Sequence, residues 1–272
     1  MITSTANSRV RLLRSLADRR GRMRSGLFLV EGLRLAEEAL AAGIRPTLAI
    51  YDATTLPDSP SAHAILSGLE EACDWMEPAS SHVLSSVSDV QHGQGLVLAV
   101  PLPSAPPPEQ RRRPGALQDV TLILDQVSDP GNAGTILRVA RAGGVREVSI
   151  SAGAVDVFAP KVVRAAAGAH FWLYLRTGFS WGSSQDLLRH LEHIVLADAH
   201  GGLPFWELDW TGAVGLIVAA EARGASEAAK RAVTERVRIP MPGGGESLNV
   251  AMATSVLLFE AVRQRTLLGA RR

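Results

Sequence analysis

The segment IPMPGGGESLNVAMATSVLLFEAVRQR, from Ile239 to Arg265, decides the fold more than any other part of the chain. Its first residues, preceded by Val237 and Arg238, have the apolar, β-branched character of a short strand. Three glycines and a polar cluster, Glu246–Asn249, follow, and a long apolar helix completes the segment. Because so much glycine beside polar side chains permits a sharp bend and a close approach to another group, we expect a ligand-binding loop here.

Strands and helices alternate regularly through the second half of the chain. Apolar, β-branched runs predict strands, and apolar residues recurring every three or four positions predict helices. Strands are expected at Val120–Leu124, Glu147–Ile150, His193–Ala197, Val214–Ala219 and Val237–Ile239, and helices at Gly131–Ala142, Pro160–Ala167, Ser184–Leu191, Ser226–Ala232 and Leu248–Leu267. The alternation predicts an α/β fold with a parallel sheet covered on both faces, which binds ligands at the carboxyl ends of its strands.

A proline- and arginine-rich stretch, residues 101–115, separates this half from a smaller N-terminal part. It lacks apolar periodicity, so we expect a linker between a domain at 1–100 and a domain at 116–272. The N-terminal part is predicted to be a small α/β domain. Its helices are expected at Ser8–Arg20, Leu33–Leu40 and Ala62–Ala72, and its strands at Phe28–Glu31, Leu48–Tyr51 and Leu96–Val100.

Composition limits the class of protein. The chain has 272 residues, 46% of them hydrophobic, which is enough for one large domain or two modest ones. The net charge is only +1, but arginines crowd the first 34 residues and recur at Arg111–Arg113. Such clusters favour contact with a polyanion, and a solvated helix face is the alternative interpretation.

Several kinds of site are not expected. The single cysteine, Cys73, excludes an intramolecular disulfide, and the seven histidines are scattered, so we expect no metal. No apolar run reaches about 18 residues, which predicts a soluble, cytoplasmic protein.

Two further motifs follow predicted strands. The first, DQVSDPGNAGTILR, runs from Asp125 to Arg138 and places Asn132 near a helix start, where its amide can cap the helix or hold a loop. Arg138 and Arg141 follow on that helix and either face solvent or point toward a phosphate. The second motif, LIVAAEARG, ends a buried strand in small residues that permit close backbone approach.

Taken in order, the three motifs resemble the SpoU/TrmH family of RNA ribose 2′-O-methyltransferases, within the SPOUT superfamily. The N-terminal FLVEG segment with Arg34 and Glu38 resembles the substrate-binding domain of that family. The resemblance therefore covers nearly the whole chain. It implies a trefoil knot in the catalytic domain, S-adenosyl-L-methionine (AdoMet) as cofactor, RNA as substrate, and a homodimer.

The resemblance also implies roles for individual residues. The catalytic residues implied are Asn132, Arg138, Glu221, Ser247 and Asn249. The implied AdoMet-binding residues are Ala219, Gly224, Ile239, Met241, Ser247, Leu248 and Asn249. For RNA binding we predict Arg9, Arg11, Arg34, Arg141 and Arg164.

The sequence departs from the family pattern at a few positions. Ala219 and Ala222 stand where glycine is usual, and Trp172 and Tyr174 stand where arginine and proline are frequent. The expected function is methylation of a ribose 2′-hydroxyl in large-subunit ribosomal RNA. The alternatives are a transfer RNA methyltransferase, a ribosomal RNA methyltransferase for antibiotic self-resistance, and a non-enzymatic RNA-binding module. A Rossmann-type enzyme is disfavoured, because no G-x-G-x-x-G follows the first strand.

Overall fold

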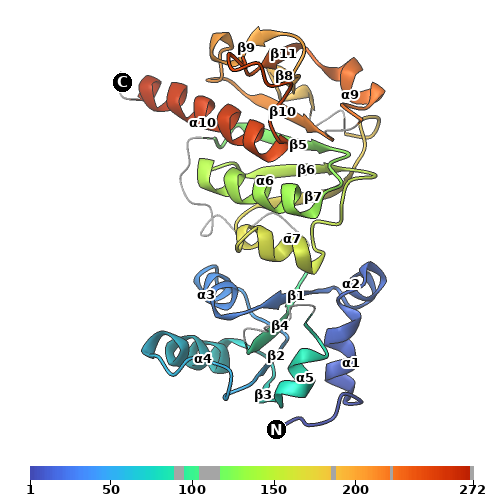
Figure 1. The fold of residues 1–272 in the computed structure, drawn as a ribbon, viewed down its shortest axis with the longest axis vertical. Coiled ribbons are helices and arrows are strands. Elements are labelled where there is room, and N and C mark those ends of the chain that lie inside the picture. The colour runs from blue at the N-terminus through green and yellow to red at the C-terminus, as the bar shows by residue number, and fades with distance from the viewer. Residues whose placement is uncertain (89–94, 104–116, 185–187, 221–222, 270–272) are drawn as a thin grey trace. The chain divides into compact units, whose positions relative to one another are not determined.

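The computed structural model describes residues 1–88, 95–103, 117–184, 188–220 and 223–269 (Figure 1). The chain forms two compact units. Unit 1 comprises Met1–Ser104 and Asp156–Phe171, and unit 2 comprises Ala105–Val155 and Trp172–Arg272. Within the described ranges, no helix is both long and apolar enough to cross a membrane.

Unit 2 is built on a seven-stranded sheet in the order β7-β6-β5-β10-β8-β11-β9, with every neighbouring pair parallel. Its strands are β5 (Val120–Asp125), β6 (Glu147–Ser151), β7 (Tyr174–Phe179), β8 (His193–Ala197), β9 (Leu203–Pro204), β10 (Val214–Ala219) and β11 (Glu235–Arg238). The predicted parallel α/β sheet is therefore confirmed. The knot implied by the resemblance remains a prediction.

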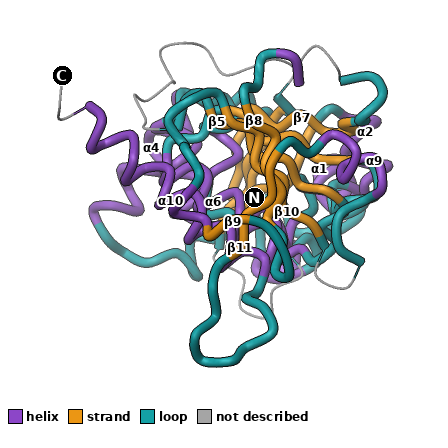
Figure 2. Tube along the Cα trace, turned by 90° about the horizontal axis from the view of Figure 1, so that it is seen from above, coloured by secondary structure: helices purple, strands orange, loops and turns teal. Residues whose placement is uncertain are grey.

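Helices cover both faces of this sheet, as the near-continuous apolar strands require. They are α6 (Pro130–Gly143), α9 (Glu227–Ala232), α10 (Val250–Gly269) and the short 3-10 turn η3 (Phe205–Glu207). Figure 2 shows α6 and α10 on one side of the strands and α9 on the other. Ile123 and Ile217 pack with Ala229 of α9. Because side chains alternate along a strand, Leu122 and Leu216 point to the opposite face.

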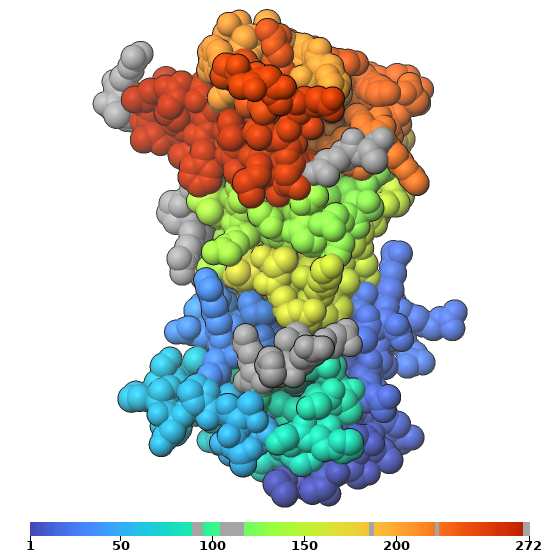
Figure 3. Space-filling view, viewed as in Figure 1, coloured from blue at the N-terminus to red at the C-terminus, as the bar shows by residue number. Residues whose placement is uncertain are grey.

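Helix α10 lies at the surface of unit 2, where Figure 3 shows it in red. Leu257, Leu258 and Ala261 are buried, whereas Met252 and Phe259 are about half exposed, at 52% and 49%. Met252 and Phe259 are seven positions apart and therefore share one helix face. This helix thus has a buried side and an apolar side that the described residues leave about half exposed.

The strand β7 was not predicted from the sequence. It lies at the edge of the sheet, and only two of its residues, Leu175 and Phe179, are buried. An edge strand with mostly exposed side chains lacks the apolar run by which the central strands are recognised.

Unit 1 contains a four-stranded sheet in the order β1-β4-β2-β3. The strands are β1 (Leu27–Glu31), β2 (Leu48–Tyr51), β3 (Met76–Pro78) and β4 (Leu96–Pro101), with β4 antiparallel to β1 and β2, and β3 parallel to β2. The helices are α1 (Ser8–Ser15), α2 (Arg19–Ser25), α3 (Leu33–Ala41), α4 (Pro60–Ala72), α5 (Ser81–Ser85), α7 (Pro160–Ala165) and the 3-10 turn η2 (Ala169–Phe171). The predicted linker falls mostly in 104–116, outside the described residues.

The predicted single helix Ser8–Arg20 is wrong, because the chain turns between α1 and α2. At this turn a Cβ atom on Gly21 would stand 1.8 Å from the carbonyl oxygen of Ser15, so only glycine fits. The guanidinium of Arg22 is buried behind the turn and donates to the carbonyl oxygens of Leu16 and Ala17, at 2.6 and 2.7 Å. Two short helices joined by a tight corner therefore replace one long helix.

The segment Asp156–Phe171, inside the predicted domain at 116–272, packs with unit 1. Phe158 and His170 pack around Phe28 of β1, with ring centroids 5.3 and 5.9 Å from the Phe28 ring. Asp156 accepts a hydrogen bond from Arg22 at 2.7 Å. Aromatic packing and a partly buried ion pair thus join this segment to the N-terminal residues, a contact that sequence order does not reveal.

His170 makes unit 1 sensitive to acid. Its ring is buried, its Nε2 lies 2.7 Å from the carbonyl oxygen of Val157, and burial lowers its pKa from 6.5 to about 4. The unfolded chain therefore binds a proton first, and stability present near pH 7 is lost as the pH falls from about 6.5 to about 4.

We expect the free energy of unfolding of unit 1 to drop by up to about 3 kcal/mol over that range. Urea unfolding at a series of pH values measures this slope. His170→Gln should flatten the slope, whereas His63→Gln, at an exposed histidine of the same unit, should leave it unchanged. An equal slope in His170→Gln and the unaltered protein would contradict the assignment.

Candidate active site

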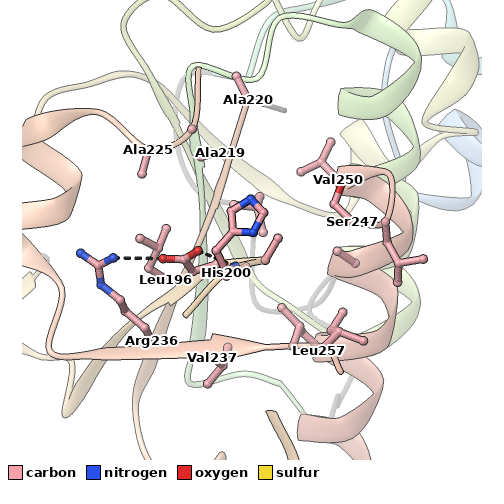
Figure 4. A pocket seen from close by; sticks show the side chains of 18 of the residues that line it. Leu196, His200, Ala219, Ala220, Ala225, Arg236, Val237, Ser247, Val250 and Leu257 are labelled. Carbon is pink, nitrogen blue, oxygen red and sulfur yellow. Dashed lines mark hydrogen bonds and ion pairs between the residues drawn. The ribbon is translucent and has the colours of Figure 1, made fainter. Parts of the chain in front are cut away.

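A pocket of about 430 Å³ opens at the carboxyl ends of β8, β10 and β11, beside the start of α10 (Figure 4). This is the edge of a parallel sheet at which ligands are expected. Its walls combine an apolar part, including Leu196, Val237 and Leu257, with polar groups at the rim. A volume of this size, an apolar wall and a few polar groups are typical of a small-molecule site.

Six of the seven predicted AdoMet-binding residues line this pocket: Ala219, Gly224, Ile239, Met241, Ser247 and Leu248. The seventh, Asn249, is not among the lining residues. The pocket keeps its volume with the methyl groups of Ala219 and Ala220 in its wall, so the departure from glycine leaves room for a ligand.

The glycines Gly243–Gly245 have a different place from the one expected. They are exposed and do not line the pocket, although Met241 and Glu246 on either side do. Gly244 has a φ of +79°, which side chains disfavour, so it supplies the turn of the loop. The glycines thus shape the loop while its flanking residues form the wall.

Sequence reasoning missed the polar residues of the loop after β8. Asp198 and His200 line the pocket, and the carboxylate of Asp198 accepts from Arg236 at 3.0 Å and from the backbone N–H of His200 at 3.0 Å. Figure 4 shows the imidazole of His200 inside the cavity. The available signal was the position of Asp198–His200 directly after a predicted parallel strand, where such sheets bind ligands.

The structure brings Asn132 and Asn249 together across 117 positions of sequence. The Nδ2 of Asn249 donates to the Oδ1 of Asn132 at 2.9 Å. Asn249 also begins α10, since its Oδ1 accepts from the backbone N–H of Ala251 at 3.0 Å. The first and third motifs therefore meet at this pair, next to the pocket-lining Ser247.

The suggested capping role of Asn132 is wrong. Asp129 is the N-cap of α6, and its Oδ1 accepts from the backbone N–H of Asn132 at 2.7 Å. Because Asp129 caps the helix, the Asn132 side chain is not the cap, and its Oδ1 accepts the hydrogen bond from Asn249.

The arginines of the first motif differ in their surroundings. Arg138 is exposed on α6 and forms no hydrogen bond or ion pair with any residue that the structure describes. Arg141, partly buried, has its guanidinium 5.1 Å from the ring centre of Trp172, one of the departures from the family pattern. A cation over an aromatic face is a stabilising contact, and Trp172 makes this contact with Arg141.

The predicted RNA-binding residues of unit 1 all keep some exposure. Arg9, Arg11 and Arg34 are exposed, and the Arg9 guanidinium lies 4.0 Å from the ring centre of Trp75. Arg164 is partly exposed and pairs with Glu31 at 3.3 Å. Glu221, Ala222 and Arg111–Arg113 lie outside the described residues.

Two other predictions concern thiol and metal chemistry. Cys73 is a free, partly buried thiol whose Sγ contacts the carbonyl oxygen of Trp75 at 3.1 Å, and burial raises its pKa. A raised pKa makes a thiol less reactive. Among the described residues, no group of three or more histidine, cysteine, aspartate or glutamate side chains is arranged to hold a metal ion.

Comparison with known proteins places these features in a family. Residues 119–259 match the SpoU rRNA Methylase family, and residues 7–98 match the MRM3-like substrate binding domain. An uncharacterized tRNA/rRNA methyltransferase of Synechocystis is 32% identical over 97% of this chain and 94% of its own length. The 23S rRNA (guanosine(2553)-2′-O)-methyltransferase of Bacillus subtilis is 27% identical over 95% of this chain and 97% of its own.

A solved structure agrees with both matches. The SpoU methyltransferase AviRb of Streptomyces viridochromogenes, in complex with AdoMet, superposes with a TM-score of 0.81 at 28% identity, covering 96% of this chain and 98% of that one. The family match spans more than half of the chain, and the similarity in sequence and structure extends over both units. The chain therefore belongs to the SpoU rRNA methylase family.

Proposed function

We propose that the protein transfers a methyl group from AdoMet to a ribose 2′-hydroxyl of large-subunit ribosomal RNA. Membership of the SpoU family makes it an AdoMet-dependent RNA methyltransferase. The observation that carries the proposal is the contact of Asn132 with Asn249 beside a pocket lined by Ser247. Asn132 of the first motif and Asn249 of the third thus meet beside a cavity that is lined by residues of the second and third motifs.

The pocket suits AdoMet chemically. Leu196, Val237 and Leu257 offer an apolar surface for an adenine ring, and the small residues Ala219 and Gly224 leave the backbone accessible for hydrogen bonds. Asp198 and Glu246 place carboxylates at the rim, where a hydroxyl donor or a positive charge would be favoured. When bound, the cofactor supplies an electrophilic methyl group on its sulfonium.

The protein then has to position a ribose hydroxyl and stabilise charge on its oxygen. We assign the orientation of that hydroxyl to Asn132, Asn249 and Ser247. An arginine stays protonated at neutral pH, so Arg138 is unsuited to act as a base. We assign it the neighbouring phosphate and the developing alkoxide, which a guanidinium stabilises by charge and paired hydrogen bonds.

We favour large-subunit ribosomal RNA as the substrate because the sequence similarity to a relative named for that RNA extends through both units. The Bacillus subtilis relative, named for 23S rRNA, matches 95% of this chain and so includes the N-terminal part. Within unit 1, α1 and α2 expose Arg9, Arg11, Arg14, Arg19, Arg20 and Arg24. Clustered exposed arginines attract RNA phosphates and give binding that weakens with salt.

A second copy of the chain is the partner proposed for α10. Met252, Phe259 and Leu267 are about half exposed along one side of this helix, which is unusual for large apolar side chains on a free surface. A homodimer through α10 would cover them. A monomeric mass in analytical ultracentrifugation would contradict this part of the proposal.

A cytoplasmic location, where ribosomes are assembled, belongs to the same proposal. Cell fractionation tests this location.

The function is tested by comparing ribosomal and transfer RNA from cells with and without the gene. A single 2′-O-methyl group in large-subunit RNA should disappear with the gene and return with the purified enzyme and AdoMet. The variant Arg9→Gln/Arg11→Gln should bind that RNA more weakly, with a salt slope lower by about 2, while AdoMet affinity stays unchanged. A missing methyl group in transfer RNA alone would overturn the substrate, and no change in any RNA would overturn the function.

A further inference from the structure

The carboxylate of Asp125, at the carboxyl end of β5, is buried, with 1% of the residue exposed. A buried carboxylate is costly unless hydrogen-bond donors surround it. The donors here are the backbone N–H of Ser226 at 2.6 Å, the Ser226 hydroxyl at 3.2 Å and the indole Nε1 of Trp181 at 3.3 Å. Within the part of the chain that the structure describes, no arginine, lysine or histidine pairs with it. The donors are therefore neutral groups fixed in the protein.

The main chain of Asp125 also binds the segment after β10, whose described residues are Ala220 and Gly224–Ser226. The backbone N–H of Ala220 donates to the carbonyl oxygen of Asp125 at 3.2 Å, directly after β10. Gly224, with a φ of +66°, then donates its N–H to the carbonyl oxygen of Ala220 at 2.8 Å. The backbone carbonyl of Asp125 thus holds Ala220, directly after β10, and the carboxylate of Asp125 holds Ser226.

The described residues of this segment form one wall of the pocket. Ala220, Gly224 and Ala225 all line the cavity, and Figure 4 shows Ala220 and Ala225 on the same side of it as Ala219. Ser226 also accepts from the backbone N–H of Ala229 at 3.1 Å and so begins α9. One carboxylate therefore fixes both the pocket wall and the helix behind it.

We propose that Asp125 is a positioning residue that holds Ala220 and Gly224–Ser226 in the arrangement that binds the ligand. This inference rests on the proposed function, because it takes the pocket to be the AdoMet site. Asp125 begins the first motif, and Ser226 follows two positions after Gly224, the last residue of the second, so the carboxylate links the first motif to the end of the second. Asp125 does not line the pocket, so its effect on AdoMet passes through these residues.

The test compares AdoMet dissociation constants of Asp125→Ala, Asp125→Asn and Trp181→Phe, measured by calorimetry on the full chain. Asp125→Ala leaves a buried N–H without an acceptor and should weaken AdoMet binding by about tenfold or more. Asp125→Asn keeps one acceptor oxygen and should restore part of the affinity. Trp181→Phe removes only the longest of the three hydrogen bonds and should change affinity by about twofold at most.

A matched control separates positioning from general loss of stability. Val148→Ala opens a cavity in β6, away from the pocket, and should destabilise unit 2 while leaving AdoMet affinity unchanged. In steady-state kinetics Asp125→Asn should raise KM for AdoMet and leave KM for RNA and kcat near their original values. Equal AdoMet affinity in the Asp125 variants and the unaltered enzyme, or an equal loss in Val148→Ala, would overturn the inference.

The same titration distinguishes the two levels of the proposal. If the unaltered protein does not bind AdoMet, the proposed function fails, and this inference fails with it. If the unaltered protein binds AdoMet and the Asp125 variants bind it equally well, only the positioning role fails. Where Asp125→Ala does not fold, Asp125→Asn, which keeps the shape of the side chain, decides the question.

Discussion

We expect Arg138→Ala to lower the methyl-transfer rate at saturating AdoMet and RNA by about a hundredfold or more. Removing one preorganised donor from a developing oxyanion has an effect of that size in other enzymes. Arg138 is exposed on α6 and is not among the residues that line the pocket. AdoMet affinity should therefore stay within about threefold of the original value. Single-turnover kinetics and calorimetry measure the two quantities separately.

Arg146, exposed at the amino end of β6, provides the matched control, because Arg146→Ala removes the same charge from unit 2 far from the carboxyl ends of the strands. Its turnover should match that of the unaltered enzyme. Arg138→Lys keeps the charge without the planar fork and should recover only part of the rate. Weakened AdoMet binding with normal turnover at saturation would remove Arg138 from the chemistry.

The second large effect concerns the folding of unit 1. Arg22→Ala should lower its free energy of unfolding by about 3 kcal/mol, because it removes the closest cation from Asp156, whose carboxylate keeps the backbone N–H of Phe158 at 2.9 Å, and the donor from two carbonyl groups. The Arg22 side chain is 4% exposed and lies 2.7 Å from Asp156. The effect should appear as faster hydrogen exchange of the β1 and α2 amides.

Arg20→Ala is the control for this prediction, since Arg20 lies two positions away on α2 and is exposed. Surface substitutions of this kind change stability by about 0.5 kcal/mol or less. The double variant Arg22→Ala/Asp156→Ala should cost less than the sum of its parts, because the two side chains contact each other. Equal protection of β1 in Arg22→Ala and Arg20→Ala would show that the buried pair contributes nothing.

The arginines near the N-terminus show where sequence prediction stops. Arg9, Arg11 and Arg22 belong to one run of the same residue type, so charge patterning treats them alike. The structure exposes the first two and buries the third, beside a corner at which a Cβ atom on Gly21 would clash with the carbonyl oxygen of Ser15. Burial depends on contacts with Asp156, 134 positions away, and no local pattern contains them.

The strands β8 and β10 match their predicted bounds, since central parallel strands are continuous apolar runs between turn residues. The edge strand β7 was missed for the opposite reason. Six of the predicted AdoMet-binding residues line the pocket, and all six lie within the second and third motifs. Asp198 and His200 were not, since a short polar loop carries no periodic signal.

The sequence by itself determined the parallel α/β sheet, the three motifs and the family they indicate, because periodicity and motif spacing are local properties of a chain. Tertiary structure alone decided which motif residues meet. It set Asn249 against Asn132, placed Asp129 rather than Asn132 at the helix cap, and buried Asp125 where it holds the pocket wall. It also gave Asp156–Phe171 to unit 1. Each of these contacts joins residues whose proximity follows from packing the whole sheet and core, which no single stretch of sequence specifies.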